Sequence, residues 1–388
     1  MFKKSKNHKK MLFAVSLSTL GNALFDYVNT VFITSFPNSI YYLAIYQNIE
    51  FVINIIFSPI GGVLGDKFNK KFILVLVDLI SALACTLGLF FLRTEKALVY
   101  ILLLNAILAI ITCFYFPVIK SYPKEILYKN EIEIFNSNLS IFQEISRVIS
   151  PVLGLFLYKY FSIELIYIIN IITFVMTGII EFTTISIIES SISDSGNTKV
   201  SFNAFQFFKE NLSLKNIVLN TAIFNFFLSG YNLTLPYLVR EMNNFYAIIL
   251  FSESIGTILG GALFTKISHK ISLKNSVKFC GLSIISSIIL FSTGEQIFQY
   301  ISLIGFMLFG FFLTIFSVGV TSYFQKTIDS SIISRFWGWF STIIAIFMPF
   351  GGILFSIINQ EINEELSLLL IGLSIFLLST VILEVEIE

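Results

Sequence analysis

The chain has 388 residues, of which 56% are hydrophobic and only 13% are charged, and its net charge at pH 7 is +1. A soluble domain carries about a quarter charged residues, so this composition excludes a soluble globular protein and predicts a protein that crosses a membrane many times. The small net charge says nothing about partners, because membrane proteins distribute their charge by side of the bilayer.

The chain begins with a basic cluster that a long apolar run follows. Five lysines fall within residues 3–10, and the apolar run continues to about residue 36. That run is too long for a signal peptide, and no small-residue cleavage site ends it. We therefore interpret the cluster as a cytoplasmic anchor of the first membrane helix and expect no nucleic-acid partner.

Apolar segments of about twenty residues, the length that crosses the hydrocarbon core of a bilayer, recur along the whole chain. They predict an all-α membrane protein with twelve transmembrane helices. These helices are expected near residues 11–36, 39–64, 72–92, 97–119, 139–160, 163–185, 214–238, 243–267, 275–293, 298–325, 335–358 and 366–385.

Two halves of six helices each are predicted from a polar interval in the middle of the chain. Residues 1–188 form the first half, 189–213 a cytoplasmic linker, and 214–388 the second half. The first and seventh helices support this repeat, because each carries three polar residues at spacings of 4 and 3. Polar faces that match by coincidence are the alternative. The residues are Asn22, Asp26 and Asn29 in one helix and Asn225, Ser229 and Asn232 in the other.

Positive charge predicts the orientation of the helices. Most of the 25 lysines and arginines fall on the side of the N-terminus, and the opposite loops contain only Arg93, Lys96, Lys159 and Arg240. Cytoplasmic loops are the ones enriched in basic residues, so both termini are expected in the cytoplasm.

A short basic loop separates the second and third predicted helices. Residues 62–71 read GVLGDKFNKK, and this pattern resembles the loop between helices 2 and 3 of major facilitator superfamily transporters. A short cytoplasmic loop that merely collects lysines is the alternative. The resemblance implies close helix packing at the glycine and a conformational latch on the cytoplasmic face, formed by Gly62, Asp66, Lys67, Lys70, Lys71 and Asp78.

Further motifs narrow the resemblance within that superfamily. Residues 78–82 read DLISA and are similar to the D-L-x-R-A motif of the macrolide-efflux and enterobactin-exporter branch, with Ser81 in place of the arginine. Residues 150–154 read SPVLG where the branch has G-P-x-x-G. The resemblance implies a transporter that rocks its two halves and exports amphipathic or hydrophobic compounds in exchange for protons.

Buried carboxylates are costly in a bilayer, so each one is a candidate for function. Asp26 shares a helix face with Asn22 and Asn29, and Glu50 shares one with Gln47 and Asn54. The resemblance places the first helix along a central cavity, so Asp26 and Glu50 are candidates for binding the coupling proton or a sodium ion. A structural hydrogen bond between helices is the alternative for both.

Three other sites have acidic side chains within predicted helices. Glu253 shares a face with Gly256 and Gly260, which favours tight packing and leaves a coupling role and a structural hydrogen bond both open. Glu144 and Arg147 lie three residues apart, a spacing that allows an ion pair within one helix. Glu181 falls at the end of the sixth predicted helix, where we expect it to be solvated.

Several enzyme and pump signatures are absent from the sequence. It contains no phosphate-binding G-x-x-x-x-G-K-(S/T) motif and no H-E-x-x-H or paired Cys/His cluster, so we expect no ATP-driven pump, enzyme, metal or cofactor. We expect a monomer in the plasma membrane of a bacterium, with a small amphipathic substrate. The alternatives are a dedicated exporter of an endogenous metabolite such as a siderophore or small peptide, a solute importer, and a membrane scaffold that does not transport.

Overall fold

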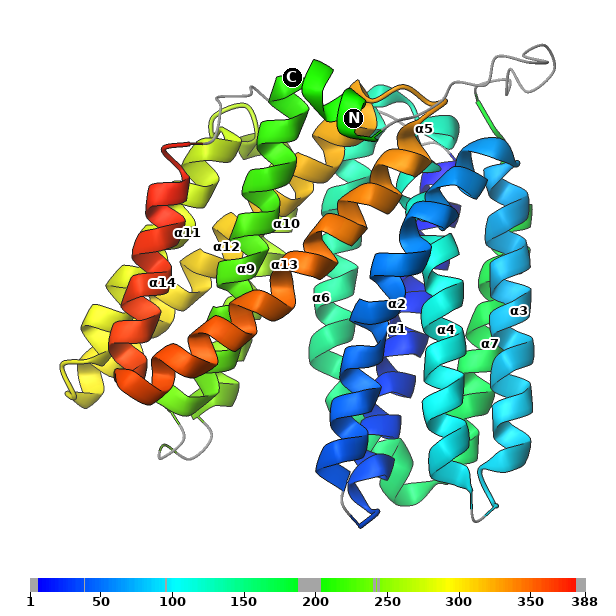
Figure 1. The fold of residues 1–388 in the computed structure, drawn as a ribbon, viewed down its shortest axis with the longest axis horizontal. Helices are drawn as coiled ribbons and strands as arrows, with labels where there is room; N and C mark the ends of the chain where they lie inside the picture. Colours follow the sequence, from blue (N-terminus) through cyan, green and yellow to red (C-terminus); the bar gives the residue numbers. More distant parts are fainter. Residues whose placement is uncertain are drawn as a thin grey trace. The chain divides into compact units, whose positions relative to one another are not determined.

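The regular secondary structure of the chain is α-helical throughout the part that the structure describes (Figure 1). The structure is a computed structural model, and it describes residues 6–37, 39–94, 96–187, 204–239, 242 and 245–381. The predicted all-α fold is confirmed. The helices are α1 (Lys6–Thr34), α2 (Ser39–Lys67), α3 (Lys70–Phe91), α4 (Ala97–Ser121), α5 (Pro123–Ile126), α6 (Lys129–Tyr160), α7 (Ile163–Phe182), α8 (Ala204–Glu210), α9 (Leu212–Leu238), α10 (Phe245–Ile267), α11 (Leu273–Phe291), α12 (Gln296–Thr327), α13 (Ile333–Glu361) and α14 (Glu364–Leu378).

Eleven of these helices are long and apolar enough to cross a membrane. They correspond to the first eleven predicted segments, and α14 corresponds to the twelfth, predicted at 366–385. Residues 382–385 of that segment lie outside the described residues, as does the predicted linker up to residue 203. The described remainder of the linker contains the short helix α8.

Helix starts depend on polar side chains that a hydropathy pattern does not register. The helix predicted from residue 139 begins ten residues earlier as α6, where the Glu131 carboxylate accepts the backbone N–H of Tyr128 at 3.2 Å. Asn69 accepts the N–H of Phe72 in the same way at the start of α3. Such caps satisfy backbone donors that the first helical turn leaves unpaired.

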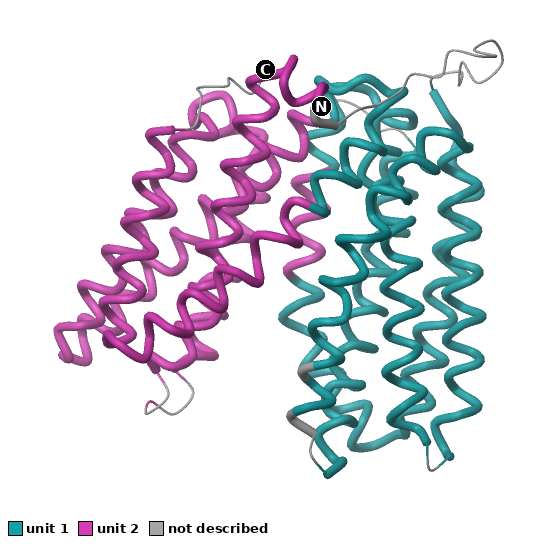
Figure 2. Tube along the Cα trace, viewed as in Figure 1, with its two compact units in different colours: residues 1–135, 145–202, 325–342 teal, residues 136–144, 203–324, 343–388 magenta. Residues whose placement is uncertain are grey.

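The chain forms two compact units, shown in different colours in Figure 2. Unit 1 comprises residues 1–135, 145–202 and 325–342, and unit 2 comprises 136–144, 203–324 and 343–388. Two short segments, 136–144 and 325–342, therefore group with helices distant in sequence. The predicted division at 188 and 214 does not consider these exchanges and stays a prediction.

Unit 1 is built from close pairs of long helices. α2 packs along α4, α3 packs along α7 and α4, and α1 packs along α7. At the α2–α4 crossing, a Cβ added to Gly61 would lie 2.0 Å from the Cys113 carbonyl oxygen, so only glycine fits there. An aromatic and aliphatic cluster around Tyr167 and Phe25 fills the space between α1, α3 and α7.

Unit 2 uses glycine still more heavily at its helix crossings. A Cβ on Gly256 of α10 would lie 1.8 Å from the Met307 carbonyl oxygen of α12, and one on Gly310 of α12 would lie 2.2 Å from the Glu253 carbonyl oxygen. Small residues allow such close approach of membrane helices, because packing and hydrogen bonds hold them together there. α14 completes the unit by packing on α11 and α9.

Candidate functional site

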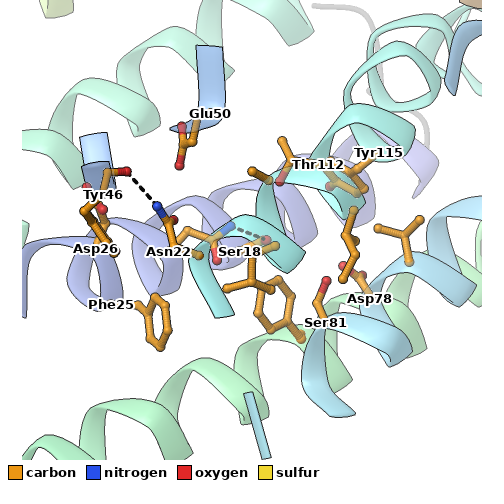
Figure 3. Close-up of a pocket in the computed structure, with 16 residues that line it drawn as sticks. Ser18, Asn22, Phe25, Asp26, Tyr46, Glu50, Asp78, Ser81, Thr112 and Tyr115 are labelled. Carbon is orange, nitrogen blue, oxygen red and sulfur yellow. Dashed lines mark hydrogen bonds between the residues drawn. The ribbon is translucent and has the colours of Figure 1, made fainter. Parts of the chain in front are cut away.

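A polar cavity of about 160 Å³ lies within unit 1 (Figure 3). Helices α1, α2, α3 and α4 form its wall, and α7 contributes Phe174. Sites for drug-sized ligands span about 300–1,000 Å³, so this cavity is suited to water and ions. Two groups of polar residues face it, one around Asp26 and one around Asp78.

The first group combines two carboxylates with a tyrosine. Asn22 and Asp26 lie one turn apart on α1, Tyr46 and Glu50 lie one turn apart on α2, and all four line the cavity. The Tyr46 side chain hydrogen-bonds the Asp26 carboxyl group, and Asp26 is near enough to Glu50 for their charges to interact. Asp26 and Glu50 are exposed while Tyr46 is buried, so both carboxylates are open to the cavity.

Buried polar residues hold this tyrosine in place. Tyr167 on α7 donates its hydroxyl to Asn29 Oδ1 at 3.1 Å, and Asn29 in turn hydrogen-bonds the Tyr46 side chain. Asn105 on α4 donates to the Tyr46 carbonyl oxygen at 2.7 Å. Asn29, predicted to line the cavity, therefore lies behind it as a support. Sequence reasoning missed Tyr46, although its position one turn before Glu50 was a usable signal.

Two more residues of the predicted polar face lie outside the cavity wall. Gln47 is exposed on α2 and does not line the cavity. Asn54 Oδ1 accepts the Ser58 hydroxyl at 2.8 Å and lies 3.5 Å from both Cys113 Sγ on α4 and Ser341 Oγ on α13. Asn54 thus connects three helices.

The second polar group lies around Asp78. Asp78 and Ser81 on α3 line the cavity together with Tyr115 on α4 (Figure 3). Tyr115 donates its hydroxyl to Glu181 Oε1 on α7 at 3.5 Å, and Glu181 and Asp78 contact each other. Asp78, predicted as part of the cytoplasmic latch, is therefore buried at the cavity wall.

The expected solvation of Glu181 is wrong, because this side chain is 0% exposed. The chain that follows α7 covers the end of the helix. Ile187 donates its N–H to the Glu125 carbonyl oxygen at 2.9 Å, and Asn7 on α1 bonds the carbonyl oxygens of Ile126 and Ile185. A hydropathy pattern places the helix end at water, but these contacts remove it from water.

Glu253, the coupling candidate of unit 2, has a different environment. It is buried on α10 and accepts a hydrogen bond from the Tyr231 hydroxyl on α9. Of the polar residues predicted on α9, Asn225 donates to the Thr221 carbonyl oxygen of its own helix, Ser229 is half-buried, and Asn232 is exposed. These contacts belong to unit 2 alone and form no acidic cluster within its described residues.

The C-terminal end of α2 meets the first turn of α13, which belongs to unit 1. Asp66 accepts the backbone N–H groups of Ser334 at 2.8 Å and Arg335 at 3.0 Å, and the Arg335 Nε at 2.9 Å. A carboxylate is favourable at a helix N-terminus because unpaired N–H groups point at it. Gly62 permits the approach, since its Cβ would lie 2.6 Å from the Ser334 carbonyl oxygen.

The lysines at the end of α2 and the start of α3 differ in their surroundings. Lys70 forms an ion pair with Glu125 of α5, and Lys71 donates to the Thr184 carbonyl oxygen at 3.1 Å. Lys67 is exposed. Of the predicted latch residues, Gly62 and Asp66 contact α13. Lys70 and Lys71 bind to other parts of unit 1.

Glu144 and Arg147 differ in burial on α6. Glu144 is 8% exposed, whereas Arg147 is exposed. Their ion pair stays a prediction.

The comparisons with known proteins agree with this architecture. The family model of the Major Facilitator Superfamily matches residues 11–352. Macrolide efflux protein A of Streptococcus pyogenes is 24% identical and aligns over 95% of this chain and 92% of its own.

Solved structures of transporters share the fold. A bacterial homologue of the iron transporter ferroportin, in its outward-facing state, has a TM-score of 0.78 at 17% identity and covers 97% of this chain and 98% of its own. The Escherichia coli fucose:proton symporter has a TM-score of 0.76 at 15% identity, with coverage of 97% and 98%. The chain belongs to the major facilitator superfamily and is a multi-pass membrane protein, a secondary transporter and not an enzyme.

Proposed function

We propose that this transporter exports amphipathic or hydrophobic compounds across the plasma membrane of a bacterium in exchange for protons, with both termini in the cytoplasm. The observation that carries the proposal is the pair of carboxylates, Asp26 and Glu50. Both open onto the small polar cavity beside Tyr46. The likeness to macrolide efflux protein A supports the substrate class and the direction of transport. The excess of lysine and arginine on the side of the N-terminus supports the orientation.

The chemistry of coupling follows from the two carboxylates. A carboxyl group that faces water binds or releases a proton at little cost, whereas the same group closed off from water favours its neutral form. Alternating access of the cavity to the two sides of the membrane would therefore load a proton on one side and release it on the other. Tyr46 donates to the carboxylate that Asp26 becomes after release, and so stabilises the ionised state of the cycle.

The proposal predicts that removing either carboxylate stops transport driven by a proton gradient. Fluorescent dyes and macrolides would be added outside inverted membrane vesicles that contain wild type, Asp26→Asn or Glu50→Gln, with and without an imposed pH gradient. Uptake driven by the gradient is expected for the wild type, with loss in both variants to the level of vesicles without the protein. Substrate binding should persist, because the amides keep the size of the side chains.

Glu295→Gln is the matched control, since Glu295 is an exposed acid outside the cavity. It should transport like the wild type. Transport that persists in both cavity variants would contradict coupling at this site. Transport that depends on a sodium gradient instead of a proton gradient would identify sodium as the coupling ion. Folded protein that transports none of the compounds would favour a dedicated exporter, an importer or a scaffold.

A further inference from the structure

Unit 1 contains a second pair of acidic side chains, separate from Asp26 and Glu50. Asp78 on α3 and Glu181 on α7 are 2% and 0% exposed, and their side chains contact each other. One oxygen of each, Asp78 Oδ2 and Glu181 Oε2, is buried and has no hydrogen-bond partner among the residues that the structure describes. Carboxylate oxygens accept hydrogen bonds and donate none, so two facing carboxylates bond each other only if one carries a proton.

Among the described residues, the Tyr115 hydroxyl is a hydrogen-bond donor to this pair. Tyr115 donates to Glu181 Oε1 at 3.5 Å. The nearby lysines donate to backbone carbonyl oxygens. Lys10 donates to that of Thr183 at 2.8 Å, and Lys71 to that of Thr184 at 3.1 Å. Tyr122, the residue after α4, pairs with the Thr184 hydroxyl at 2.6 Å, and α1 contributes a backbone carbonyl to Thr177. Within the described residues, no ion pair brings a cation to either carboxylate.

We propose that Asp78 and Glu181 bind one proton between them and form a second proton-binding site of the transporter. Two ionised carboxylates in contact repel each other, and burial without a cation makes that state costly. Two neutral carboxyl groups would offer the Tyr115 hydroxyl no charged oxygen, and a hydrogen bond to a charged oxygen is stronger than one to a neutral oxygen. One shared proton gives both orphaned oxygens a partner and leaves a single negative charge, which the Tyr115 hydroxyl stabilises.

The cavity gives this site access to protons. Asp78 and Tyr115 line it, whereas Glu181 lies behind them, so a proton reaches Glu181 through Asp78 or Tyr115. The same cavity has the Asp26 group at its other end (Figure 3). Water within it would connect the two acidic groups, and the proton that Asp78 takes up would come from that water. This step deepens the proton coupling proposed above, although proton binding by the pair does not depend on the substrate.

The backbone beside the pair leaves room for the Asp78 side chain. Gly178 lies one turn before Glu181 on α7, and a Cβ added to it would lie 3.4 Å from the Asp78 Cβ and 3.7 Å from Asp78 Oδ2. These are ordinary van der Waals distances. Gly178→Ala therefore alters packing beside the pair without removing a carboxyl group, which makes it a matched control.

The test measures protonation directly by infrared spectroscopy of the full-length protein in lipid nanodiscs, without substrate. The double variant Asp78→Asn/Glu181→Gln is compared with the wild type at neutral pH. It is expected to lose the carbonyl band of one protonated carboxylic acid and the band of one ionised carboxylate, while Gly178→Ala keeps both. Loss of two ionised bands, or of two protonated ones, would overturn the shared proton. A band change that depends on sodium would overturn it in favour of a cation site.

Two further measurements keep the result interpretable. If the double variant does not fold, Glu181→Gln alone is expected to shift or abolish the protonated band, and an unchanged band would overturn the proposal. The vesicle assay separates this inference from the proposed function. A wild-type protein that shows the band but transports none of the compounds would refute only the exporter, whereas transport with no shared-proton band would refute only the pair.

Discussion

The two units differ in how they treat acidic side chains within their helices. Unit 1 opens Asp26 and Glu50 onto a cavity and places Asp78 in the wall of the same cavity. Unit 2 buries Glu253 under the Tyr231 hydroxyl, at a crossing where Gly310 touches the Glu253 backbone. A carboxylate that opens onto water is able to exchange a proton, whereas one enclosed by close-packed backbone is suited to holding helices together. We therefore propose that unit 1 handles the coupling ion and that Glu253 is a structural acid of unit 2.

The largest expected effect separates these two kinds of acid. Glu253→Gln keeps an oxygen that accepts the Tyr231 hydroxyl, so we expect it to retain transport driven by a pH gradient. Asp26→Asn should reduce that transport to the level of vesicles without the protein. The measurement is initial uptake into inverted vesicles at equal amounts of folded protein. Complete loss in Glu253→Gln together with activity in Asp26→Asn would reverse the assignment of the two units.

The sequence predicted the helices well because length and hydropathy alone determine what crosses a bilayer. It also selected Asp26 and Glu50, since charges within apolar runs are conspicuous. It did not predict which backbone groups Asp66 would meet, because Ser334 and Arg335 lie more than 250 residues away along the chain. It placed Glu181 in water for the same reason: the covering contacts of Asn7 and Ile187 come from distant segments.

The second expected effect tests the contact between Asp66 and α13. The Asp66 side chain is 0% exposed and that of Arg335 is 16% exposed. Removing one partner of a buried pair costs about 3–5 kcal/mol, because the other charge is left unpaired. We expect Asp66→Ala to lower the apparent melting temperature of the detergent-solubilised protein strongly. Asp66→Asn, which keeps one acceptor for the α13 N–H groups, should lower it less, and equal values for the two variants would contradict the charge–helix contact.

The third effect compares a crowded glycine of unit 2 with an uncrowded glycine of unit 1. A Cβ on Gly256 would lie 1.8 Å from the Met307 carbonyl oxygen, whereas one on Gly178 meets nothing closer than 3.4 Å. Overpacking costs about 1–3 kcal/mol or more when backbone must move. Gly256→Ala should therefore destabilise the protein, and Gly178→Ala should be neutral or slightly stabilising, because alanine is about 1 kcal/mol better than glycine in a helix. The melting temperatures of both variants, measured by thermal unfolding, give the comparison. Equal melting temperatures would show that the α10–α12 crossing accommodates an added methyl group without cost.

The smallest effect concerns an ion pair of unit 1 whose arginine is exposed. Arg93 Nε lies 2.8 Å from Glu164 Oε1, but the Arg93 side chain is 83% exposed. Such exposed pairs contribute about 0.2–1 kcal/mol, because solvent screens the charges and ordering the side chains costs entropy. Arg93→Gln should thus leave transport unchanged and shift the melting temperature only slightly, with the small difference disappearing at high salt, where surface charges are screened. A loss comparable to that of Asp66→Ala would mean that burial does not distinguish the two ion pairs. A negligible change in melting temperature would indicate that the buried ion pair, and not the exposed one, stabilises this unit.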